Sequence, residues 1–298
     1  MQTPKPDDAA SQLHEFLGAG PALVLTGAGM STDSGIPDYR RPDGTRRALP
    51  MQHGEFVGSS GARQRYWARS FIGWQRFSAA DPNDGHRALA RLASARALGT
   101  IITQNVDGLH QRAGSPDVIE LHGSLSRVVC LSCGTAVGRD ALQQRMASEN
   151  AGFERHSRGM APDGSQVGSQ IRPDGDIVLD QAAVAHFHSP VCAVCRSDTL
   201  KPDVVFFGGS VPPDRVAQCV DRTDRAPSLL VLGSSLAVMS GLRFVRQAAR
   251  RGIPIAIVTR GATRGDDLAT LRLDVALTPT LVALTAKVGE RPCLHSDA

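Results

Sequence analysis

The sequence contains no apolar run of the ~18 residues that a membrane-spanning helix needs. Lysine is scarce, with three lysines against thirty arginines, and the net charge is only +4. Because the arginines are scattered rather than gathered in a block, nothing indicates a nucleic-acid surface. Residues 1–10 lack both the apolar segment of a secretion signal and the arginines of a transit peptide. We therefore expect a cytoplasmic protein that binds neither membrane nor nucleic acid.

The composition is that of an ordinary globular protein, with 41% hydrophobic and 21% charged residues among 298. Short apolar, β-branched runs recur and predict buried strands. Helical patterns separate several of them, which predicts an α/β fold with a parallel, doubly wound, Rossmann-like sheet. The predicted strands are 22–25, 100–103, 118–121, 204–207, 229–232, 253–258 and, more weakly, 274–277. The predicted helices include 86–98, 212–223, 241–251 and 280–288.

Two segments interrupt this alternation of strands and helices. Residues 41–84 contain a polar turn and an aromatic helical stretch, and residues 127–200 contain paired cysteines within Gly- and Pro-rich sequence. We expect them to form the helical part and the cysteine-bearing part of a small domain inserted twice into the Rossmann-like one. The larger domain would comprise residues 12–40, 85–126 and 201–290, with flexible tails at 1–11 and 291–298.

Four of the six cysteines form two C-x-x-C pairs, Cys130 with Cys133 and Cys192 with Cys195. Without a secretion signal, such pairs favour a metal over disulfides, and four thiolates can complete one tetrahedral zinc site. The spacing alone leaves open two unrelated pairs, and a redox dithiol would need only one pair. The other two cysteines stand alone, and we expect a buried small side chain at one and a tail thiol at the other.

The first predicted strand leads into the glycine- and hydroxyl-rich segment LTGAGMSTDSGIPDYR at 25–40. Glycines behind a strand allow the backbone to approach an anion closely, so this loop suits a phosphate. It does not fit the fingerprint of hydride-carrying dinucleotides, because Thr32 stands at the third glycine position and residues 49–51 supply no acid. The loop therefore indicates a phosphate ligand rather than a hydride carrier.

Polar side chains also follow other predicted strands, at the sheet edge where doubly wound folds bind ligands. Each has a structural alternative. A lone histidine such as His122 is commonly a hydrogen-bonded structural residue, Asn105 and Asp107 would cap a following helix, and residues 233–235 would form an ordinary turn. Because all these clusters would line one crevice, we interpret His122 as a general base acting on sugar hydroxyls at a nucleotide site.

Seven segments in order give the chain a resemblance to a known family. They are GAGMSTDSGIPDYR, TQNVDGLH, ELHGS, the two C-x-x-C pairs, LKPDVVFFGG and GSSL. Together they resemble the sirtuins over residues 21–284, and the segments at 51–77, 173–180 and 263–273 are similar to the class II, sirtuin-4 branch. The resemblance implies that NAD+ is a co-substrate that is cleaved, and that one structural zinc per chain is held by the four paired cysteines.

The resemblance also implies a role for individual residues. His122, Asn105 and Asp107 would be the catalytic group, with His122 taking a proton from a ribose hydroxyl so that the acyl group passes to ADP-ribose. The phosphates and ribose would contact Gly27, Ala28, Ser31 and Arg40. The nicotinamide and its ribose would contact Gly35, Ile36, Pro37, Asp38, Gln104, Asn105 and Asp107. The adenosine half would contact Gly233, Ser234, Ser235, Thr259, Arg260, Gly261 and Leu277.

The implied substrate is an acylated lysine of a protein, whose backbone would add as a strand beside residues 204–206. The substrate-binding residues would be Val204, Val205, Phe206 and Gly208. Two positions depart from the family pattern. Gly209 follows FFG where an acid is frequent, which would loosen the substrate loop, and Thr259 replaces a common asparagine at the adenosine ribose.

The leading hypothesis is a monomeric, NAD+-dependent protein-lysine deacylase. Protein mono-ADP-ribosyl transfer or lipoamidase activity at the same site are the alternatives within the family. From a different class, a zinc-bearing NAD+ sensor without turnover would not need Asn105, Asp107 and His122 together. Acetyl, longer aliphatic, dicarboxyl and lipoyl groups all remain open as the acyl group.

Overall fold

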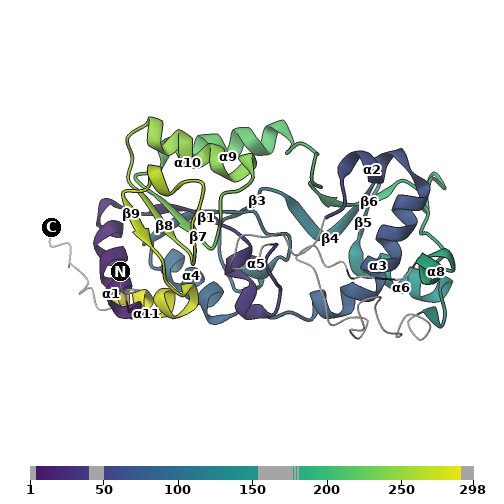
Figure 1. Cartoon of the computed structure of the whole chain (residues 1–298), viewed down its shortest axis with the longest axis horizontal. Coiled ribbons are helices and arrows are strands. Elements are labelled where there is room, and N and C mark those ends of the chain that lie inside the picture. Colours follow the sequence, from purple (N-terminus) through teal and green to yellow (C-terminus); the bar gives the residue numbers. More distant parts are fainter. Residues whose placement is uncertain (1–4, 40–49, 154–176, 178, 180, 290–298) are drawn as a thin grey trace, which may run out of the picture.

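The computed structural model describes residues 5–39, 50–153, 177, 179 and 181–289, and its largest element is a six-stranded sheet (Figure 1). The strands lie in the order β3-β2-β1-β7-β8-β9, and all neighbours are parallel. From β1 the chain adds strands first in one direction, to β2 and β3, and then in the other, to β7, β8 and β9. The switch point between β1 and β7 is where doubly wound folds bind ligands. The predicted α/β fold is therefore confirmed. The strands are β1 (Ala22–Thr26), β2 (Leu98–Thr103), β3 (Val118–Glu120), β7 (Leu229–Leu232), β8 (Ile255–Val258) and β9 (Leu271–Leu273).

Helices cover both faces of this sheet, because successive side chains of a buried strand point to opposite faces. Val24 of β1 joins the apolar cluster formed with α1, α4 and α11, whereas Leu25 joins the cluster formed with α9 and α10. Figure 1 shows α9 and α10 above the sheet and α4 and α11 below it. These helices are α1 (Pro6–Phe16), α4 (Asp84–Ser94), α9 (Pro213–Arg225), α10 (Met239–Arg250) and α11 (Leu277–Gly289).

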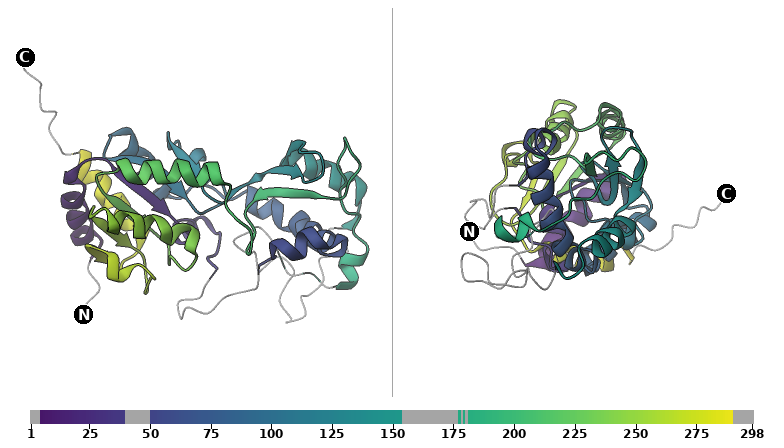
Figure 2. Two further views of the ribbon diagram at one scale, coloured as in Figure 1. Left: turned by 90° about the horizontal axis from the view of Figure 1, so that it is seen from above. Right: turned by 90° about the vertical axis from the view of Figure 1, so that its right-hand side faces the viewer.

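A second, three-stranded sheet lies at the end of the molecule away from the N-terminus (Figure 2). Its strands are antiparallel and lie in the order β5-β4-β6. Helices pack on it around an aromatic core that includes Trp67, Phe71 and Phe187. The elements are β4 (Gly123–Cys130), β5 (Ala136–Gly138), β6 (Leu200–Val204), α2 (His53–Gly58), α3 (Ser60–Ser78), α6 (Arg139–Glu149) and α8 (Gln181–Ala185).

The strand predicted at 204–207 in the parallel sheet is wrong. Strand β6 ends at Val204 and pairs antiparallel with β4, where Leu200 lies opposite Cys130. A short apolar run does not specify its partner strand. Here the two C-x-x-C pairs lie at the end of β4 and shortly before β6, and they bring these strands together, so the segment that ends at Val204 joins the small sheet and residues 205–207 lie beyond it. Strand β4 also crosses the proposed domain boundary at 126, and that division of the chain remains a proposal.

The chain ends also differ from the prediction. Residues 1–11 were expected to be a flexible tail, but α1 begins at Pro6, and Ala9 and Ala10 are fully buried. Proline at the start of α1 and acids in its first turn are sequence signals that favour helix initiation. The weak strand predicted at 274–277 is β9 instead, and α11 starts at Leu277. The tail predicted at 291–298 lies outside the described residues.

A search of the described part of the chain for membrane-spanning helices finds none that combines the required length with the required apolar character.

Candidate active site

The loop after β1 packs directly on the loop after β7, at the switch point of the large sheet. A Cβ atom on Gly27 would lie 2.8 Å from the Ser234 Cβ, and one on Gly29 would lie 2.9 Å from the Gly233 carbonyl oxygen. The Gly29 N–H donates to that same carbonyl at 2.9 Å. Only glycine fits at these two positions, which explains the glycine spacing without a hydride-carrier fingerprint.

Asn105 and Asp107 lie against this loop. The Asn105 amide donates to the Gly27 carbonyl and to the Ser31 hydroxyl oxygen, both at 3.0 Å. The Ser31 hydroxyl donates to Asp107 Oδ2 at 2.7 Å. Burial raises the pKa of Asp107, and hydrogen bonds to its carboxylate oppose that shift. Asp107 also accepts from the N–H of Leu109, the first residue of α5 (Leu109–Arg112), but the N-cap residue of this helix is Gly108, so the capping alternative is not confirmed as predicted.

His122 lies between the two sheets, directly before β4. Its Nδ1 lies 2.9 Å from the Gln104 carbonyl oxygen, and its Nε2 lies 2.8 Å from the Ser240 hydroxyl. A carbonyl oxygen only accepts, so Nδ1 carries the hydrogen and Nε2 of the neutral ring keeps its lone pair. Burial lowers the pKa of His122, and the Arg215 charge lowers it further. The imidazole is therefore neutral near pH 7, as a general base must be.

Gln104 links His122 to the β7 loop. The Gln104 side-chain oxygen accepts from the Ser234 hydroxyl at 2.6 Å, while its backbone oxygen accepts from His122. The predicted polar clusters after β1, β2, β3 and β7 are therefore joined by hydrogen bonds into one network.

The remaining predicted residues are more loosely connected to this network. Those following β8 lie at the same edge of the sheet, where Gly261 N–H donates to Asp274 and the Thr259 carbonyl accepts from Arg272. Leu277 is half-buried and packs on the apolar cluster formed with α1, α4 and α11.

The other predicted residues differ in exposure. Ser235 and Arg260 are exposed, Ile36 is buried in the core of the small sheet, and Gly35 has φ of +81°. Ala28 begins a short 3-10 turn, and Pro37 and Asp38 are half-buried. Arg40 lies outside the described residues.

The predicted substrate segment is tied to His122 through its backbone. The Val205 N–H donates to the His122 carbonyl oxygen at 2.8 Å. Gly123 has φ of +82°, and a Cβ there would lie 1.9 Å from the Asp203 carbonyl oxygen, so the two chains cross too closely for any side chain. Phe206 packs on Phe56 and Tyr66, with ring centroids 5.1 and 5.3 Å away, and Gly208 follows with φ of +77°. This segment therefore leads from His122 to an aromatic cluster.

The four paired cysteines form one cluster at the far end of the small sheet. All four sulfur atoms lie within 4.8 Å of one another, with Cys130 and Cys195 3.5 Å apart and Cys133 and Cys192 3.7 Å apart. Tetrahedral zinc with Zn–S bonds of about 2.3 Å requires S–S distances of about 3.8 Å. The cluster therefore fits a structural zinc site and excludes two unrelated pairs.

The pKa values of Cys130 and Cys133 are lowered, which favours their thiolate forms. The backbone N–H of Ser197 lowers the pKa of Cys195, but burial and the neighbouring sulfur atoms outweigh it, so that this pKa is raised. Burial raises the pKa of Cys130, but the backbone N–H groups of Cys133 and Ser132 outweigh it and bring the pKa to about 6. All the described cysteines are free thiols, and Cys219 is fully buried, as predicted for a small apolar side chain. Cys293 lies outside the described residues.

Two buried histidines, neither of which was predicted, stand behind Asn105. His110 Nε2 lies 3.0 Å from the Thr26 hydroxyl, which donates to the Thr103 hydroxyl oxygen at 2.9 Å. That oxygen accepts from the Asn105 N–H. The ring of His86 on α4 packs edge-on against His110, with centroids 4.9 Å apart. His86 lies on α4 and His110 on the four-residue helix α5, and no sequence pattern distinguishes either from a surface residue.

Acidification is expected to destabilise the fold through these two histidines. Burial lowers the pKa of His86 to about 4 and that of His110 to about 3, with smaller contributions from Arg87 and from His86 respectively. An unfolded histidine titrates near pH 6.5, so only the unfolded chain takes up these protons as the pH falls below that value. Each histidine should therefore lower the free energy of unfolding by up to ~1.4 kcal/mol per pH unit.

Denaturant unfolding measured between pH 7 and pH 5 tests this expectation. The double variant His86→Gln/His110→Gln should lose up to ~2.7 kcal/mol per pH unit of the slope, and the exposed His186→Gln should keep it. An equal slope in the double variant and the wild type would contradict the assignment of these protons.

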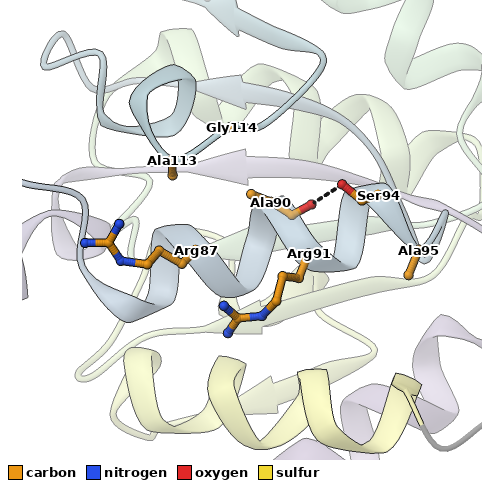
Figure 3. Close-up of a pocket in the computed structure, with 7 residues that line it drawn as sticks. All are labelled: Arg87, Ala90, Arg91, Ser94, Ala95, Ala113 and Gly114. Atoms are coloured by element: carbon orange, nitrogen blue, oxygen red, sulfur yellow. Dashed lines mark hydrogen bonds between the residues drawn. The ribbon is translucent and has the colours of Figure 1, made fainter.

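A surface hollow elsewhere on the large sheet contains none of the predicted site residues. It is lined by one face of α4 and by Ala113 and Gly114, which lie in the turn after helix α5 (Figure 3). Arg87 and Arg91 border it, and the Ser94 hydroxyl donates to the Ala90 carbonyl. The chemistry-bearing residues therefore do not meet in this hollow.

Comparison with known proteins finds a matching family, similar sequences and similar solved structures. Residues 27–240 match the Sir2 family. The chain is 53% identical to NAD-dependent protein deacetylase 1 of Streptomyces coelicolor over 278 residues, which is 93% of this chain and 89% of that protein. It is 47% identical to the human NAD-dependent protein lipoamidase sirtuin-4, mitochondrial, over 260 residues, covering 85% of this chain and 78% of that protein. A solved complex described as Sir2-p53 peptide-NAD+ superposes with a TM-score of 0.71 at 29% identity, covering 93% of this chain and 98% of that one.

Proposed function

The chain belongs to the Sir2 family, and we propose that it is an NAD+-dependent protein-lysine deacylase in which His122 is the general base. The observation that supports this role is the geometry of His122, whose Nδ1–H donates into the hydrogen-bonded network that joins the loops after β1, β2 and β7, so that Nε2 keeps its lone pair. The same network contains Asn105, Asp107 and Ser31.

NAD+ is the co-substrate: it supplies nicotinamide as the leaving group and the ribose that accepts the acyl group. The loop from Gly27 to Ser31 holds the phosphates and ribose in this proposal, because it lies at the switch point, is packed tightly on the β7 loop and leaves Ala28 and Gly29 half-buried. Asn105 and Asp107 orient the nicotinamide ribose. Their positions are fixed by the bonds to Ser31, so the ribose would meet preorganised groups.

The acylated lysine enters along the segment from Val204 to Phe206. Its backbone adds as a strand, and its acyl carbonyl is held at contact distance from the ribose. That carbonyl oxygen would bond to C1′ of the ribose as the glycosidic bond to nicotinamide breaks. His122 then takes a proton at Nε2 from a ribose hydroxyl, which frees that oxygen to attack the acyl carbon. Expulsion of the lysine amine and addition of one water molecule then leave free lysine, nicotinamide and acylated ADP-ribose.

The zinc is structural in this proposal, because four thiolates fill the tetrahedral shell and leave no position for a substrate. We further propose that the protein acts as a monomer in the cytoplasm, where free cysteines of this kind persist in the reduced state.

Incubation of the protein with NAD+ and acyl-lysine peptides tests the function. We expect one nicotinamide and one acyl-ADP-ribose for every lysine freed. Protein carrying ADP-ribose would indicate the transferase alternative instead, and absence of nicotinamide release from every peptide would contradict both enzymatic functions. Because the relatives include deacetylases and a lipoamidase, the panel should include acetyl and lipoyl peptides compared by kcat/KM.

A further inference from the structure

The first turn of α10 is pressed against the His122 and Gln104 pair. Ser240, the second residue of this helix, places its hydroxyl 2.8 Å from His122 Nε2. At the next position a Cβ on Gly241 would lie 2.6 Å from the Gln104 side-chain nitrogen. A larger residue at 241 would therefore have to displace the Gln104 side chain, whereas glycine lets the helix approach until Ser240 reaches Nε2.

The hydrogens of this contact are determined by the neighbours of His122. Nδ1 donates to the Gln104 carbonyl, so the neutral ring offers only a lone pair at Nε2, and Ser240 must donate its hydroxyl hydrogen there. After the ring takes a proton, Nε2 becomes a donor, and the Ser240 oxygen has lone pairs to accept from it. A hydroxyl can donate to the neutral ring and accept from the protonated ring. A carbonyl could only accept, and an ammonium group could only donate.

We propose that Ser240 is a positioning residue for His122 during acyl transfer. This inference rests on the proposed role of His122. In the free enzyme Ser240 holds the imidazole in the orientation that points Nε2 into the site. When a ribose hydroxyl donates to Nε2, the Ser240 hydrogen rotates away, and the proton moves from the ribose oxygen to Nε2. Ser240 keeps its own proton throughout and accepts the new N–H, which stabilises the imidazolium.

The surroundings of His122 make this acceptor important. The ring is buried, and the Arg215 charge on α9 further disfavours the imidazolium, as the lowered pKa of His122 shows. The Gln104 carbonyl satisfies Nδ1 but not Nε2. Without Ser240, a buried charged N–H would form with no described partner of its own at Nε2, and such a group is costly.

Two reactions separate this role from general support of the fold. Exchange of labelled nicotinamide into NAD+ needs peptide binding and cleavage of the glycosidic bond but no ribose-hydroxyl base, whereas lysine release needs the base. Ser240→Ala should therefore lower the kcat of deacylation by about 10- to 100-fold, the size expected for one hydrogen bond to a charged group. Nicotinamide exchange and the KM for NAD+ should stay within about twofold.

Matched variants complete the test. Ser240→Thr keeps the hydroxyl and should restore deacylation to within about threefold, and the exposed Ser148→Ala on α6 should match the wild type. Equal loss of exchange and deacylation in Ser240→Ala, failure of Ser240→Thr to restore deacylation, or no loss at all in Ser240→Ala would overturn the inference. Absence of exchange in the wild type would instead overturn the proposed function.

Discussion

Replacing His122 by alanine is expected to lower the kcat of deacylation by about 10²- to 10⁴-fold, the usual contribution of a positioned general base. The reason is that Nε2 is the group placed to remove the ribose proton, with Nδ1 fixed by Gln104. Cleavage of NAD+ does not need this proton transfer. Nicotinamide exchange and NAD+ binding should therefore persist in the variant, measured by label incorporation and by calorimetry.

The exposed His186→Ala is the matched control, since it removes an imidazole far from this network. Its turnover should equal that of the wild type. Retention of near wild-type deacylation by His122→Ala would remove the proposed base, and loss of NAD+ binding would indicate that the histidine supports the pocket instead.

Replacing Cys192 by serine is expected to remove zinc and stability together. Among the residues that the structure describes, the cluster supplies four thiolates and no further ligand, so a three-thiolate site binds the ion far more weakly. The two C-x-x-C pairs hold β4 beside β6, so loss of the ion should weaken the pairing of these strands in the small sheet. We expect zinc to fall from one per chain to near zero by elemental analysis, and Tm to fall by about 10 °C or more.

Cys219→Ala is the control for this experiment, because Cys219 is buried in the α9 and α10 cluster and is not part of the quartet. It should retain one zinc per chain with a smaller change in Tm. If Cys192→Ser also kept one zinc and an unchanged Tm, the four-cysteine site would be wrong.

Much of the large sheet could be predicted because its strands are buried on both faces. Strand β7 matches the predicted range 229–232, and β1 and β2 differ by one or two residues. The edge of the sheet that carries the candidate site could be predicted from the same pattern, because parallel strands bring their carboxyl ends together. The cysteine quartet was predictable because C-x-x-C pairs carry a fixed ligand geometry.

Other features depend on contacts that no local pattern contains. The run at 204–207 has the composition of a strand, but only Val204 lies in β6, which pairs with β4 beside the C-x-x-C pairs. Ser240 was not predicted because the helix was expected to begin at 241, one position too late to include it. His86 and His110 meet only after α4 packs beside the loop that follows β2. In each case tertiary packing supplies the information.

A crystal structure of the wild-type protein with NAD+ and an acyl-lysine peptide tests most directly whether His122 and the loop from Gly27 to Asp38 share one nicotinamide riboside. We predict that His122 Nε2 lies within hydrogen-bonding distance, about 2.6–3.2 Å, of a ribose hydroxyl or is separated from it by one water. A nucleotide bound with its ribose beyond reach of that nitrogen, and with the imidazole turned out of the pocket, would contradict the account.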